Sequence, residues 1–196
     1  MKTAPSFSSL FIVPLAILGW PTLAHAHVGI GEPSGLLSGL THPLTGLDHL
    51  CAMVGVGLWA AQRGGRAVWL VPLAFVTVMA LGGLLGVAAV SIPFVESGIV
   101  ASVLILGILI AAAVRLPLLL SILLVGTFAL FHGHAHGAEM AHTYSALAYG
   151  LGFVLTTATL HLIGISIGLL AQKSGTMWLA RYAGAAIAVC GLYLCL

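Results

Sequence analysis

Six apolar segments follow one another along the chain, each close to the roughly 20 residues that a helix needs to cross the hydrocarbon core of a bilayer. Short breaks separate segments 37–61, 67–92, 97–114, 117–139, 144–171 and 178–196. The 196 residues include only six basic and four acidic ones, too few to cover the surface of a soluble domain. We therefore expect an all-α fold, a polytopic membrane helix bundle with six transmembrane helices in contact with a lipid bilayer.

The sparse charges also exclude several functions. Six scattered basic residues do not make the basic face that nucleic-acid binding requires, so no nucleic-acid partner is expected. The sequence has no HExxH, GxSxG or glycine-rich phosphate-loop motif. We therefore expect neither an enzyme nor a prosthetic group.

The first residues have the pattern of a secretory signal peptide. Lys2 supplies a positive charge, residues 10–18 form a short apolar stretch, and Ala24-His25-Ala26 is typical of a cleavage site. Cleavage after Ala26 divides the chain into a signal peptide, 1–26, and a single transmembrane domain, 27–196. The alternative is an uncleaved first transmembrane helix.

The charged residues orient the predicted bundle. With the mature N-terminus outside, the basic residues of the mature chain all fall on the inner side, as the positive-inside rule requires; they are Arg63, Arg66, Arg115, Lys173 and Arg181. The four acidic residues fall on or toward the outer side. We expect a multi-pass protein of the bacterial inner membrane, with both termini on the periplasmic side.

A first histidine cluster lies in the sequence HPLTGLDH, residues 42–49, at the outer end of the first segment. On one helix His42 and His49, seven residues apart, would share a face. Asp48 can bind a metal directly or hold an imidazole from behind. The alternative is that Asp48 orients His49 with no metal involved.

A second cluster lies at the outer end of the fourth segment, in the sequence FHGHAHGAE. Helical spacing puts His132, His136 and Glu139 on one face, a ligand set suited to a borderline divalent metal. His134 points elsewhere on an ideal helix. The alternative is a histidine-rich surface loop that binds metal only adventitiously.

Two further histidines are weaker candidates. His161 lies within the fifth segment, where a histidine at membrane depth suggests a transit ligand or a proton acceptor. The alternative is a packed histidine bonded to a neighbouring helix. His27 would offer both an imidazole and an α-amine after cleavage, unless that terminus is frayed.

The two motifs, HPLTGLDH and FHGHAHGAE, closely resemble the two signatures of the HupE/UreJ family of nickel permeases, and the resemblance extends over essentially the whole chain. It implies uptake of Ni²⁺ for hydrogenase or urease maturation. It carries over a metal-handling role to His42, Asp48, His49, His132, His136 and Glu139, and less firmly to His134. Co²⁺, Zn²⁺ and Cu²⁺ remain alternative cargoes, and a homo-oligomer is compatible with the sequence.

Two other functions stay open at this point. An intramembrane zinc-dependent hydrolase could use the same histidines around an activated water. A non-transporting metal-binding membrane protein would bind the ion without moving it. Measured metal flux separates both from a permease.

Overall fold

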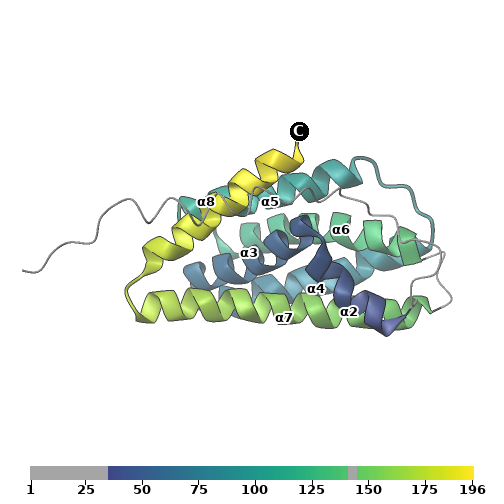
Figure 1. The fold of residues 1–196 in the computed structure, drawn as a ribbon, viewed down its shortest axis with the longest axis horizontal. Helices are drawn as coiled ribbons and strands as arrows, with labels where there is room; N and C mark the ends of the chain where they lie inside the picture. Colours follow the sequence, from purple (N-terminus) through teal and green to yellow (C-terminus); the bar gives the residue numbers. More distant parts are fainter. Residues whose placement is uncertain (1–34, 141–144) are drawn as a thin grey trace, which may run out of the picture. The chain divides into compact units, whose positions relative to one another are not determined.

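The computed structural model describes residues 35–140 and 145–196, and every regular element there is an α-helix. The helices are α2 (Leu36–Thr45), α3 (Leu47–Arg63), α4 (Ala67–Val87), α5 (Val95–Ala111), α6 (Leu118–Met140), α7 (Ala146–Lys173) and α8 (Met177–Leu194) (Figure 1). The all-α prediction is confirmed for these residues. The predicted signal peptide and His27 lie outside them.

The helices fall where the apolar segments were predicted. Four of them, α4, α6, α7 and α8, are each long and apolar enough to cross a membrane, and α2 with α3 meet the same criterion as a pair. Helix α5 is apolar but shorter, at 17 residues. The structure therefore supports a membrane protein, while the count of six crossings stays a prediction.

The first predicted span differs from expectation because it is broken. Helices α2 and α3 meet at an angle of 83°. The break is at Gly46, whose backbone is extended (φ −83°, ψ 118°) and whose N–H bonds back to the carbonyl of His42. The expectation that His42 and His49 share one face of a continuous helix is therefore wrong, since they stand on two helices.

Glycines set how closely the helices approach. Helix α4 packs along α6, α5 along α8, and α3 together with α2 along α7 (Figure 1). A Cβ on Gly133 would overlap the Met79 carbonyl, and one on Gly57 would overlap the His161 carbonyl. Only glycine permits these backbone contacts, the usual role of small residues between membrane helices.

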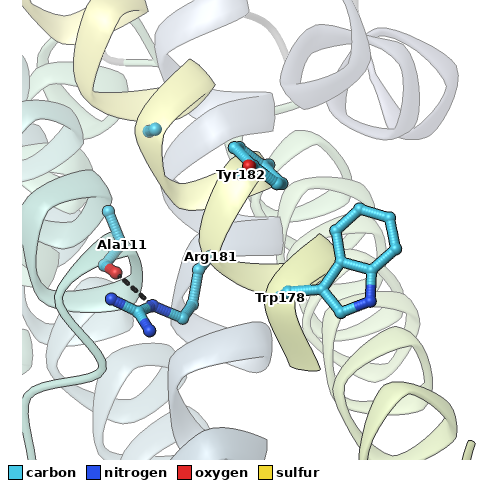
Figure 2. Close-up of a pocket in the computed structure, with 5 residues that line it drawn as sticks. Ala111, Trp178, Arg181 and Tyr182 are labelled. Carbon is cyan, nitrogen blue, oxygen red and sulfur yellow. Dashed lines mark hydrogen bonds between the residues drawn. The ribbon is translucent and has the colours of Figure 1, made fainter. Parts of the chain in front are cut away.

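One end of the bundle carries the basic side chains. Arg63, at the end of α3, donates to the Leu116 carbonyl, and Arg181 Nε on α8 donates to the Ala111 carbonyl over 2.8 Å. Figure 2 shows Arg181 reaching Ala111 beside Trp178 and Tyr182, which line a pocket of about 360 Å³. The described residues that line this pocket include no histidine, cysteine or acidic residue. It is therefore a poor candidate for metal chemistry.

Candidate metal centre

Three histidines from three helices meet at the other end of α3. His42 on α2, His49 on α3 and His136 on α6 each offer one ring nitrogen, and these atoms lie within 4.8 Å of one another. The ring centroids of His42 and His136 are 4.6 Å apart, and those of His49 and His136 are 4.5 Å apart. His49 and His136 are buried, and His42 is half-buried. We refer to these three side chains as the tri-histidine cluster.

The break at Gly46 builds half of this cluster. By bending the chain between α2 and α3, it places His42 over the first turn of α3, with the His42 and His49 ring centroids 5.6 Å apart. A Cβ at Gly46 would come within 2.8 Å of Asp48 Oδ1 and 3.0 Å of His49 Nδ1. The extended backbone at the bend is open to any residue, but glycine leaves space there for the Asp48–His49 pair.

Asp48 fixes the orientation of His49. Its Oδ1 accepts from His49 Nδ1–H over 2.6 Å and from the His49 backbone N–H over 2.8 Å. With the ring proton on Nδ1, the lone pair is on Nε2, which faces the cluster. A carboxylate bound behind a histidine in this way raises the basicity of the imidazole as a metal ligand.

Glu139 fixes the orientation of His136 in the same way. Its Oε2 accepts from His136 Nδ1–H over 3.1 Å, so the lone pair of His136 is also on Nε2. His49 Nε2 and His136 Nε2 are in direct contact. Two lone pairs that face each other need a proton or a cation between them, and two or more imidazoles suit a borderline divalent metal.

His132 lies one helical turn from His136 and is fully buried. Ser102 Oγ donates to the Ile99 carbonyl over 2.6 Å, so it accepts from His132 Nε2–H over 3.0 Å. This leaves the lone pair on His132 Nδ1, an atom with no hydrogen-bond partner among the described residues. His132 therefore stands next to the tri-histidine cluster as a further nitrogen ligand, with its ring centroid 5.2 Å from that of His49.

Helix α7 closes the cluster with two aromatic residues. Phe153 lies 4.3 Å from the His136 ring, and Tyr149 lies 6.1 Å from the His42 ring, measured between centroids. Both are buried, so they give the cluster an apolar wall on this side. Sequence reasoning missed Phe153, because an aromatic residue in an apolar helix gives no signal by itself. It also missed Ser102, for which a polar residue inside a predicted span was an available signal.

The other predicted site residues are not among the three clustered ligands. His134 points to the far side of α6, where its Nε2 bonds the Val90 carbonyl over 2.6 Å. Asp48 and Glu139 lie behind the imidazoles. His161 lies deeper in the bundle, bonded to the Met53 carbonyl, and His27 lies outside the described residues. Among the described residues, the tri-histidine cluster is the only such group of three potential ligands.

Comparison with known proteins shows similarity over most of the chain. The family model described as "HupE / UreJ protein" matches residues 15–194. The chain is 47% identical over 180 residues to Protein HupE of Rhizobium leguminosarum bv. viciae, an alignment that covers 92% of this chain and 94% of that protein. No solved structure matches the chain. Both histidine motifs fall within the matched range, and the chain belongs to the HupE/UreJ family.

Proposed function

We propose that this protein is a secondary permease that takes up Ni²⁺ across the bacterial inner membrane and so supplies the maturation of hydrogenase or urease. The observation that carries the proposal is the tri-histidine cluster, in which His49 and His136 are held by carboxylates with their Nε2 lone pairs toward each other. Such a set binds a divalent ion through neutral ligands. The nickel itself comes from the family resemblance.

The proposed topology has six membrane crossings after removal of residues 1–26, with both termini in the periplasm. The broken pair α2 and α3 makes the first crossing, and α5 makes the third. Support comes from the two ends of α3. Asp48 and His49 lie at the start of this helix, and the basic residue Arg63 lies at its end. Since positive residues mark the inner side, the tri-histidine cluster faces outward.

An ion bound at the outward-facing cluster is driven inward by the membrane potential. An inside-negative potential favours inward movement by about 2.3 kcal/mol per charge for each 100 mV. The ion exchanges some of its water for imidazole nitrogen as it enters. Neutral ligands select the ion without making a deep charge well, which allows its release inward.

The ligand set indicates a class of divalent metals and does not single out one metal. Imidazole suits Ni²⁺, Co²⁺, Zn²⁺ and Cu²⁺, and Cu²⁺ binds most tightly to such sites in general. Preference for nickel would therefore come from site geometry and from which ions are available outside the cell. We expect the other three ions to compete with Ni²⁺.

The test is metal flux into vesicles that contain the purified protein and a trapped metal-sensitive dye, with the four ions in competition. Wild-type protein should carry Ni²⁺ inward, and His136→Ala should lower the initial rate at least tenfold. His134→Ala is the matched control from the same helix, since its side chain points away from the cluster.

Other results would replace the proposal. Tight binding of Ni²⁺ with no flux would identify a non-transporting metal-binding protein. Zinc-dependent hydrolysis of a lipid or an amide by the purified protein, again without flux, would identify the hydrolase alternative.

A further inference from the structure

Beneath the tri-histidine cluster, polar and sulfur-containing side chains continue into the bundle at intervals of one helical turn. On α7 the sequence of positions is Phe153, Thr157 and His161, and on α3 it is His49 and then Met53. Each step of four residues advances about 6 Å along a helix. Polar and sulfur-containing side chains on the two helices therefore extend from the cluster toward the middle of the bundle.

His161 is held in one orientation with a ligand atom to spare. Its Nδ1–H donates to the Met53 carbonyl over 2.7 Å, so the lone pair is on Nε2. His161 is only 2% exposed. Its Nε2 is therefore shielded from solvent, and it has no hydrogen-bond partner among the described residues. A buried polar atom is costly when it is left unpaired, so His161 Nε2 is an atom that a bound ion would satisfy.

Two thioether sulfurs lie in the same layer of the bundle. Thr157 Oγ1 lies 3.3 Å from Met53 Sδ on α3 and 3.8 Å from Met79 Sδ on α4. Thr157 stands one turn from His161 on α7. All of these side chains are buried, so sulfurs from two helices lie beside Thr157, one helical turn from His161.

His132 connects this region with the cluster above. Its ring centroid is 5.2 Å from that of His49 and 5.8 Å from that of Phe75, and Phe75 lies 5.0 Å from His161. Its unpaired Nδ1 is the ligand atom that remains available. The order from outside to inside is thus His49, His132 and then His161.

We propose that His161 Nε2, with the thioether sulfurs of Met53 and Met79, forms an inner transit site for a divalent metal ion that has left the tri-histidine cluster. This inference rests on the proposed function, because a transit site has a purpose only where an ion crosses. Every ligand in the set is neutral, and thioether sulfur is a weak ligand for a divalent ion, so the site can pass the ion on.

A purely structural role for His161 predicts different behaviour. Packing and the bond to the Met53 carbonyl use only the ring and Nδ1–H. Asparagine keeps a donor close to the position of Nδ1 but has no counterpart of Nε2. His161→Asn therefore removes the proposed ligand atom while it preserves the bond that a structural residue would make.

The experiment compares wild-type protein, His161→Asn and the control Thr159→Val, which changes an exposed position on the same helix. Equilibrium dialysis at saturating Ni²⁺ should find two ions per wild-type chain and one per His161→Asn chain, with the affinity of the remaining ion within twofold. Flux should fall at least tenfold in His161→Asn only. Two bound ions and normal flux in His161→Asn would overturn the inner site.

A second pair of variants keeps the test decisive if His161→Asn does not fold. Met53→Leu with Met79→Leu preserves side-chain volume and costs little stability. Nickel-edge X-ray absorption should detect sulfur bound to nickel in wild-type protein and none in the double variant. Nitrogen and oxygen ligands alone in the wild type would overturn the thioether ligands.

The proposed function and the inner site fail in different ways. If wild-type vesicles carry no metal, the permease proposal falls, while the count of bound ions still decides the inner site. If wild-type vesicles carry Ni²⁺ and His161→Asn carries it equally well, only the inner site falls.

Discussion

His49 and His136 lie 87 residues apart in the chain, and their Nε2 atoms meet across the interface between α3 and α6. Behind each ring stands a carboxylate from the same helix, Asp48 or Glu139. The pair is therefore arranged symmetrically in chemical terms, with acid, imidazole, imidazole and acid in a row. A cation between the two rings would complete it.

The two carboxylates should control metal affinity without being ligands themselves. Asp48→Asn and Glu139→Gln remove the negative charge that strengthens the Nδ1–H bond, and loss of such a group typically costs 10–100-fold in affinity. We expect a Kd for Ni²⁺ raised by about that factor in each variant, measured by calorimetry on purified protein. Glu96→Gln, an exposed acid at the start of α5, should leave the Kd unchanged. An unchanged Kd in both site variants would contradict the positioning role.

Two histidines of the sequence FHGHAHGAE, His134 and His136, should differ in their effect on nickel uptake. His134→Gln keeps a donor for the Val90 carbonyl, so uptake of radioactive nickel by cells should stay within twofold of wild type. His136→Gln makes the same chemical change in the tri-histidine cluster and should lower uptake at least tenfold, because the amide offers no nitrogen lone pair. Equal loss in the two variants would show that His134 also handles the metal.

Acid outside the membrane should inhibit uptake. A histidine ligand must be neutral, so metal binding releases protons and weakens as the pH falls. A protonated imidazole has no lone pair for the metal, so initial rates should fall as the external pH is lowered. The rates should be measured in vesicles with the internal pH and the membrane potential held constant. A rate that rises on acidification would instead indicate that protons drive the ion inward.

The close approach of α4 to α6 should tolerate no side chain at Gly133. A Cβ there would overlap the Met79 carbonyl, whereas a Cβ at Gly126 of the same helix would meet only Val78 Cγ2 at 3.6 Å. Forced overpacking typically costs about 1–3 kcal/mol, so thermal unfolding should show a lower midpoint for Gly133→Ala. Gly126→Ala should match wild type. A normal midpoint and normal flux for Gly133→Ala would mean that the two helices can separate without consequence.

The sequence alone predicted most of the helices. Long apolar segments must form helices in lipid, because only a helix satisfies its own backbone hydrogen bonds there. The ends of α6 and α7 accordingly fall within two residues of the predicted limits, whereas α4 ends five residues before its predicted limit. The break between α2 and α3 was not predicted, since a glycine after a proline is compatible with either a continuous or a bent helix.

The candidate site was predicted as a set of residues but not as an arrangement. Histidine and carboxylate are unusual in membrane segments, and their clustering identified both motifs. Spacing along one helix also placed His132, His136 and Glu139 on a shared face, and indicated that His134 points elsewhere. It could not distinguish a carboxylate that binds metal from one that holds the imidazole, because both lie at the same spacing.

Composition, hydropathy and charge thus determined a helical membrane protein with two histidine motifs, because these properties depend on each residue and its near neighbours. The tertiary structure decided which nitrogens meet, that Asp48 and Glu139 stand behind them, and that two methionine sulfurs lie beside Thr157, one helical turn from His161. These relationships depend on the bend at Gly46 and on glycine contacts between helices far apart in the chain. Periodicity within one helix carries no information about them.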